Sequence, residues 1–225
     1  MSGPTKTVTN FAGCDYLGLS AHPQIIEALC RAARQHGISA TSSRWALGWT
    51  ELHEQLEQAL ARFMGTEDAC ILPTAYLGGP VYYASLTCQR RTVFCDELVH
   101  TNHLLGMRAE GLTIRTFKHL DVEDLQRQLA NHDGSPAIIA TDGIYSIGGE
   151  VAPLAELAAL ADSIGAELFI DDAHGVAAVG ASGRGSAELA GLQPHQATIL
   201  GSMSKAMGCA GFGTEYRFRD PKTGQ

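Results

Sequence analysis

The stretch Gly201-Ser202-Met203-Ser204-Lys205-Ala206-Met207-Gly208 places a lysine directly behind a serine-rich turn. An apolar run at residues 197–200 comes just before it, and a run of this kind predicts a buried strand. Upstream, the apolar run 168–170 leads in the same way into Asp171-Asp172-Ala173-His174-Gly175. Both polar loops therefore follow predicted strands, which indicates an α/β fold with chemical groups at the strand ends.

The rest of the chain alternates between helical and strand-like patterns. Apolar residues recur at helical spacing, with capping residues at the ends, over residues 23–36, 50–64, a segment opening at Asp121, and 153–164. Further short apolar runs lie at residues 69–72, 92–95, 113–117 and 137–140. Apolar strands separated by helices are typical of a mainly parallel sheet covered on both faces. The sequence therefore predicts a three-layer α/β/α domain.

Polar and small residues follow several of the predicted strands. They are Pro73-Thr74-Ala75-Tyr76, residues 96–100, Thr141-Asp142-Gly143, residues 171–174 and residues 202–205. In open α/β sheets, ligands bind beyond the carboxyl ends of the strands. We therefore expect these loops to converge on one site.

The composition excludes some classes of function. The net charge is −8, from 24 acidic and 16 basic residues, which argues against a nucleic acid or an anionic membrane surface as the main partner. No apolar run approaches the roughly 20 residues of a membrane-spanning helix, and residues 1–10 lack the core of a signal peptide. The six cysteines form no C-x-x-C pair and no secretion signal is recognised, so we expect reduced thiols in a cytoplasmic protein. No pair of histidines, cysteines or acidic residues has the spacing of a known metal motif, so we expect no metal site.

Lys205 is the first candidate for chemistry, because a lysine on a tight, buried loop is unusual unless it is paired or covalently used. Lysine forms the Schiff base that anchors pyridoxal 5′-phosphate (PLP), and a carboxylate pairs with the pyridine nitrogen of that cofactor. Adjacent residues of an extended chain point to opposite sides, so only one of Asp171 and Asp172 can face the cofactor. We predict Asp171, with His174 curling back beside it to bond the phenolic oxygen.

Other residues fit a phosphate or a planar ring. Thr74-Ala75-Tyr76 offers hydroxyl and backbone N–H groups at a predicted helix start, and Ser202 and Ser204 offer further hydroxyls. A histidine can stack on a ring, and from the residues alone His100 and His103 are both candidates. The predicted cofactor is therefore PLP.

These residues together resemble the α-oxoamine synthase family, PLP enzymes of the aspartate-aminotransferase fold type (fold type I). The matching segments are Asp15-Tyr16-Leu17-Gly18-Leu19-Ser20, Ser43-Arg44, Asp96-x-x-x-His100, Gly143-Ile144-Tyr145-Ser146, Asp171-Asp172-Ala173-His174-Gly175 and the lysine loop. The resemblance favours His100 as the stacking histidine, places Ser146 near the phenolic oxygen and Ser202 at the phosphate, and implies catalytic roles for Lys205, His100, Asp171 and His174. It also implies that Cys14, Ser43 and Arg44 contact substrate.

The chain departs from the family at some positions. Cys14 stands where the family commonly has asparagine, Ala75 where it has glycine, and Asp142 where it has glutamate. Family members also continue past the lysine loop with a last strand and a C-terminal domain. We therefore expect an N-terminal segment with the first helix at 1–45, a PLP-binding large domain at 46–213, and a polar, disordered tail at 214–225. The C-terminal domain is missing on this interpretation, and the sheet ends near Leu200 with an unpaired edge.

The resemblance implies an activity. The family condenses an amino acid with an acyl-CoA thioester, usually with loss of carbon dioxide, and works as a homodimer. A transaminase of the same fold type, or a truncated relative without activity, is the alternative.

Overall fold

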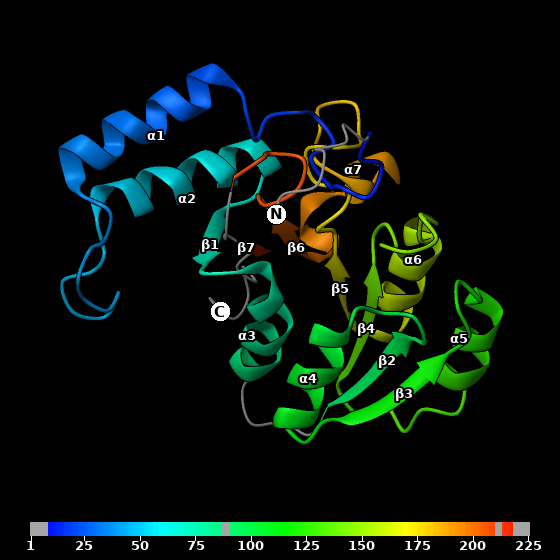
Figure 1. Ribbon diagram of the computed structural model, residues 1–225. Helices are drawn as coiled ribbons and strands as arrows, with labels where there is room; N and C mark the ends of the chain where they lie inside the picture. Colours follow the sequence, from blue (N-terminus) through cyan, green and yellow to red (C-terminus); the bar gives the residue numbers. More distant parts are fainter. Residues whose placement is uncertain (1–8, 87–90, 210–212, 218–225) are drawn as a thin grey trace, which may run out of the picture.

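The computed structural model describes residues 9–86, 91–209 and 213–217, and it shows a sheet flanked by helices (Figure 1). The strands are β1 (Asp68–Leu72), β2 (Thr92–Asp96), β3 (Thr113–Phe117), β4 (Ala137–Asp142), β5 (Glu167–Asp171), β6 (Thr198–Ser202) and β7 (Gly213–Arg217). Their order is β1-β7-β6-β5-β4-β2-β3. The pairings from β3 to β6 are parallel, whereas β7 pairs antiparallel with both β6 and β1.

Helices cover both faces of this sheet. They are α1 (Pro23–His36), α2 (Glu51–Met64), α3 (Gly78–Ser85), α4 (Thr101–Ala109), α5 (Val122–Leu129), α6 (Leu154–Ile164) and α7 (Ser186–Leu189), with short 3₁₀ turns at Ala75–Leu77 and Pro194–Gln196. Successive strand residues point to opposite faces, and the core divides accordingly. Ile139 and Ile170 pack with residues of α2, α5, α6 and α7, whereas Ile138 and Phe169 pack with residues of α3 and α4. The predicted three-layer architecture is confirmed.

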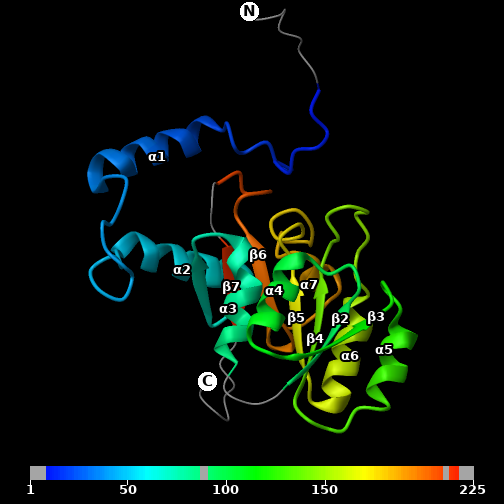
Figure 2. The same cartoon turned by 60° about the horizontal axis from the view of Figure 1, so that its bottom comes forward.

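The first helix stands apart from these layers. Figures 1 and 2 show α1 projecting away from the sheet, with the chain before it running back over the body of the molecule. No residue of α1 is buried, and Ile26 and Leu29 are 47% and 69% exposed. The apolar stripe that predicted this helix is therefore largely exposed at Ile26 and Leu29.

The prediction for the end of the sheet was wrong. Residues 213–217, which we expected to lie largely in a disordered tail, form β7 between β1 and β6. The sheet therefore does not end near Leu200, because Leu200 pairs with Glu215 and Ile71 pairs with Thr214. Residues 1–8 and 218–225 of the predicted segments, and Cys88, lie outside the described residues.

Candidate functional site

The loops that follow the parallel strands meet around a cavity of about 280 Å³. It is lined by Thr74, Ala75, Tyr76, His100, Asn102, Asp142, Ser146, Asp171, Ala173, His174, Ser202, Ser204 and Lys205. The convergence follows from the topology, because parallel strands bring their carboxyl ends to the same edge of the sheet. Apart from Asn102 and Ala173, every lining residue had been singled out from the sequence.

The two adjacent aspartates at the end of β5 occupy different environments. Asp171 lines the cavity, where its carboxylate accepts hydrogen bonds from Asn102 Nδ2 at 3.2 Å and from the Ala173 N–H at 3.1 Å. Asp172 is fully buried away from the cavity lining and accepts the N–H of Ser186 at 2.7 Å and its hydroxyl at 2.8 Å. The strand alternation therefore turns the two carboxylates apart, as we predicted.

Glycines enclose the Asp172 carboxylate. A Cβ atom added at Gly143, Gly175 or Gly185 would lie 2.4, 2.1 or 2.0 Å from one of its oxygens. Gly185 also has a φ of +92°, a conformation that side chains rarely adopt. The glycines after Asp172 in the sequence thus serve the packing of this buried acid.

A buried polar cluster lies behind Asp171. His103 is fully buried, its Nδ1 lies 3.1 Å from the Tyr83 hydroxyl, and its Nε2 lies 3.5 Å from Asp171 Oδ2. Burial opposes ionisation of Asp171, but the contact with His103 and the hydrogen bonds from Ala173 and Asn102 together outweigh it and lower the Asp171 pKa. Burial and the nearby Asp171 raise the pKa of Asp142 to about 7. The cluster thus favours a negative charge on Asp171 rather than on Asp142.

His103 and the two aspartates also lie close enough together in space to hold a metal ion. His103, Asp142 and Asp171 each offer one ligand atom, and these atoms lie within 4.8 Å of one another. Their spacing in the sequence did not reveal this group, because the residues come from α4, β4 and β5.

His100 and His103 are separated by the fold. His100 lines the cavity, meets Tyr76 edge-on at 6.1 Å between ring centroids, and accepts the Asn102 N–H at the start of α4. His103 is not among the lining residues and lies one helical turn further along α4. Of the two histidines left open by the sequence, His100 is therefore the one placed to contact a ligand.

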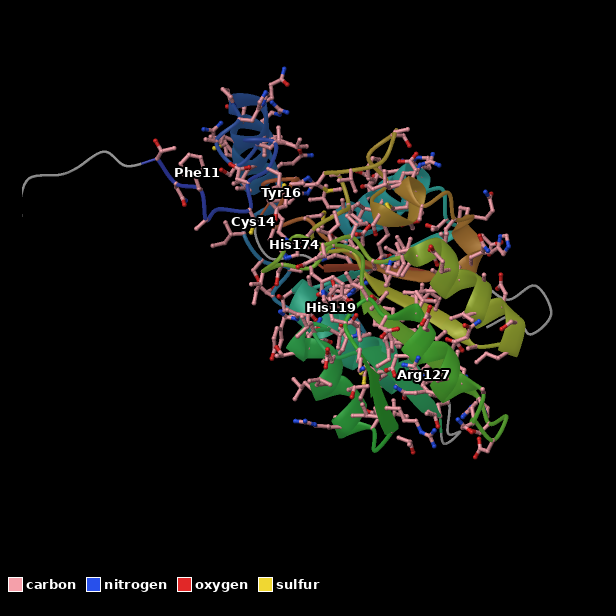
Figure 3. All side chains as sticks on the ribbon, turned by 90° about the vertical axis from the view of Figure 1, so that its right-hand side faces the viewer. Phe11, Cys14, Tyr16, His119, Arg127 and His174 are labelled. Carbon is pink, nitrogen blue, oxygen red and sulfur yellow. The ribbon has the colours of Figure 1, made fainter. Side chains whose placement is uncertain are left out.

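His174 faces the cavity beside Lys205. Burial and the Lys205 charge lower the pKa of His174 to about 4, so its ring is neutral at neutral pH. Its Nδ1 lies 2.7 Å from the hydroxyl of Tyr16, which arrives from the N-terminal segment (Figure 3). Tyr16 and Asn102 are contacts that sequence reasoning did not assign to the site, because each depends on segments far apart in the chain.

Small hydroxyl groups gather at another part of the cavity wall. The Thr74 side chain accepts the Tyr76 N–H at 3.3 Å, and the Ser202 and Ser204 hydroxyls lie 2.8 Å apart. Together with Ala75, they provide several donors on the cavity wall. This is the donor chemistry that a phosphate group requires.

The predicted substrate contacts lie elsewhere. Cys14, Ser43 and Arg44 are not among the residues that line the cavity. The Arg44 guanidinium instead donates to the Ile71 carbonyl, pairs with Glu57 at 3.0 Å and stacks over Trp49 at 4.3 Å. Arg44 therefore ties the loop before α2 to β1, and a substrate role for these three residues stays a prediction.

Comparison with known proteins places the chain in a family. It belongs to the aminotransferase class I and II family, whose model matches residues 6–214. It is similar to the 8-amino-7-oxononanoate synthase of Chromohalobacter salexigens, with 39% identity over 203 residues, which is 90% of this chain and 53% of that protein. The mitochondrial 2-amino-3-ketobutyrate coenzyme A ligase of Bos taurus is 34% identical over 214 residues, 95% of this chain and 51% of that protein.

Solved structures agree with these relatives. The serine palmitoyltransferase of Sphingomonas wittichii matches with a TM-score of 0.88 and 30% identity, covering 93% of this chain and 52% of that one. A serine palmitoyltransferase from S. paucimobilis, with a bound PLP–myriocin aldimine, matches with the same TM-score of 0.88, 30% identity and the same coverage of 93% and 52%. The predicted resemblance to the α-oxoamine synthases and the fold-type-I architecture are confirmed.

The extent of the match and the lengths of the helices add two further facts. The chain spans about half the length of the curated relatives it matches. Among the described residues, no helix combines the length and the apolar character needed to cross a bilayer.

Proposed function

We propose that this chain holds PLP and serves an acyltransferase of the α-oxoamine synthase type, which condenses an amino acid with an acyl-CoA thioester. The relatives named above, among them a structure with bound PLP, support this proposal. The observation that carries it is the meeting of Lys205, Asp171, His100 and His174 in one cavity. These groups come from three separate segments, the one before α4, the end of β5 with the loop after it, and the loop after β6, so their convergence is a property of the fold rather than of one motif.

The residues present suit the cofactor. An amine, a carboxylate, a ring and a set of hydroxyls line the same 280 Å³ cavity, and each matches one part of PLP. Asp171 suits a pyridinium, because its carboxylate is held in the charged form and lies at the cavity wall. Ala75 adds a methyl group to the hydroxyl-rich wall, but the hydroxyls of Thr74, Ser202 and Ser204 remain beside it.

The roles of the side chains follow from their chemistry. Bound there, PLP would supply an electron sink for negative charge that develops at the α carbon of an amino acid. Asp171 would hold a proton on the pyridine nitrogen, His100 would stack on the ring, and Ser146 and His174 would bond the phenolic oxygen. The Lys205 Nζ would first hold the cofactor and, once free, accept the α proton. Thr74, Ala75, Tyr76 and Ser202 would hold the phosphate.

Cofactor trapping tests the first half of the proposal. Purified chain mixed with PLP should absorb visible light, and borohydride should leave a pyridoxyl group on Lys205 in a peptide map. The Lys205→Ala variant should lose this label, whereas the matched Lys118→Ala variant should keep it. Label on Lys118 in the unchanged chain would contradict the assignment.

Product analysis tests the second half. Release of free CoA that requires both an amino acid and an acyl-CoA would support acyl transfer. The family as a whole also makes transamination a second candidate, and transfer of the amino group to a keto acid would favour it. Cofactor binding with neither reaction would favour a relative without activity.

We also propose a cytoplasmic homodimer. Ile26 and Leu29 of α1, and Ile38 and Trp45 in the segment that follows it, are exposed apolar residues that a second copy of the chain could cover. Light scattering during gel filtration would measure the mass in solution. Cys14, Cys30, Cys95 and Cys209 are free thiols, which fits a reducing compartment. Cell fractionation would test this location.

A further inference from the structure

Tyr16 contacts the site across a long sequence separation. Its hydroxyl lies 2.7 Å from His174 Nδ1, and the two rings are tilted by 50° at a centroid separation of 6.2 Å. Figure 3 shows the tyrosine reaching from the N-terminal segment toward His174. Tyr16 is 47% exposed and does not line the cavity, so its contact with the site runs through the histidine.

The turn that carries Tyr16 is firmly held. The Asp15 carboxylate accepts the N–H groups of Leu19 and Ser20 at 2.9 and 3.2 Å, and the Ser20 hydroxyl at 2.6 Å. Gly208, in the loop after Lys205, lies against this turn, since a Cβ atom there would come within 2.5 Å of the Ser20 nitrogen. The backbone of the lysine loop therefore packs directly against the turn that carries Tyr16.

The protonation states allow the Tyr16 hydroxyl to be the donor in this hydrogen bond, since the neutral His174 ring has one nitrogen without a proton. Burial and the Lys205 charge lower the His174 pKa to about 4, so the neutral ring carries one proton near pH 7. Burial, with a smaller contribution from Cys14, raises the pKa of Tyr16 to about 12, so the phenol keeps its hydrogen. A protonated phenol can donate to an unprotonated Nδ1, which leaves the imidazole proton on Nε2.

We propose that Tyr16 is a positioning residue that donates to Nδ1 of His174, fixes the Nε2–H tautomer and so turns His174 into a hydrogen-bond donor toward an anionic oxygen in the cavity. The inference deepens the proposed function, on which it rests for the identity of that oxygen, the phenolic oxygen of PLP. The opposite tautomer would offer Nε2 as an acceptor and would repel the same oxygen.

Nitrogen NMR of the cofactor-free chain tests the tautomer directly. In protein labelled with ¹⁵N-histidine, protonated and unprotonated ring nitrogens have separate shifts, and a His174→Gln variant identifies the His174 signals. We expect a protonated Nε2 and an unprotonated Nδ1 in the unchanged chain. The Tyr16→Phe variant should shift the His174 signals toward a mixture of tautomers and weaken PLP binding about threefold to tenfold, the size expected for one hydrogen bond.

The matched control is Tyr82→Phe. Tyr82 is a tyrosine outside the cavity lining whose hydroxyl donates to Glu167, so its loss should leave the His174 signals unchanged. A dominant Nδ1–H form in the unchanged chain would overturn the inference, and so would a Tyr16→Phe spectrum identical to the unchanged one. Because the NMR experiment contains no PLP, failure of the chain to bind the cofactor would refute the proposed function without deciding the tautomer.

Discussion

Replacing Asp172 by asparagine should remove a large pH dependence from the stability of the fold. Burial raises the pKa of Asp172 from 3.8 to about 6, although hydrogen bonds from Ser186 oppose the increase. Between these two pH values the folded chain holds a proton that the unfolded chain has released. The free energy of unfolding therefore falls as pH rises through this window.

The size of the effect follows from the shift. One pKa unit corresponds to about 1.36 kcal/mol, so ionising Asp172 costs the fold about 3 kcal/mol between pH 4 and pH 7. Asparagine has nearly the same shape and does not titrate. Its oxygen can accept the Ser186 N–H, and its amide can donate to the Ser186 hydroxyl after that hydroxyl rotates. The stability of Asp172→Asn relative to the unchanged chain should therefore rise by about 3 kcal/mol between pH 4 and pH 7.

Urea unfolding at a series of pH values measures this difference. Ser186→Ala is the companion variant, because it removes the hydroxyl that lies 2.8 Å from the Asp172 carboxylate. Its stability relative to the unchanged chain should fall with rising pH, which is the opposite slope. Parallel pH curves for the unchanged chain and Asp172→Asn would refute the reasoning.

Further predictions concern the cavity and the turn beside it. Asp171→Asn should preserve the fold but reduce cofactor-dependent exchange of the α proton of an amino acid, measured in deuterium oxide, far more than Asp172→Asn does. His174→Gln should lessen acid sensitivity, because the lowered His174 pKa gives stability above pH 6.5 that is lost as pH falls toward 4; urea unfolding at pH 4.5 and 7.5 measures this. Gly208→Ala should lower stability by at least about 1 kcal/mol in the same assay, because its φ is +64° and the methyl would meet Ser20.

Much of the parallel part of the fold could be predicted from the sequence. The apolar runs identified β1 to β6 to within a residue or two, and the stripe at 23–36 gave α1 with its observed bounds. These elements can be predicted from local sequence, because a buried strand is a short apolar run and an amphipathic helix repeats its apolar residues at helical spacing. The helix α3 carries no such period, since Gly78, Gly79, Tyr82 and Tyr83 are all buried.

The site was predicted less completely, because some of its contacts join segments that lie far apart in the sequence. Each of Lys205, Asp171 and His174 lies in a recognisable loop, so its chemistry could be predicted from its neighbours. The contacts of Tyr16 with His174 and of His103 with Asp171 join distant segments and have no local signature. The strand β7 was missed because residues 213–217 become a strand only through their pairing with β1 and β6.

The position of β7 also sets an order for folding. Leu72 enters the sheet through Gly213, which is made much later in synthesis, whereas the parallel strands β2, β3 and β4 lie close together in the sequence. Closing so long a loop is entropically costly, and contacts of this kind form late. During synthesis on a ribosome, we therefore expect β1 and α2 to stay unpaired with the rest of the sheet until β7 has been made. During this interval the edges of β1 and β6 are open to pairing with other chains, so the yield of native protein should depend on how quickly β7 arrives.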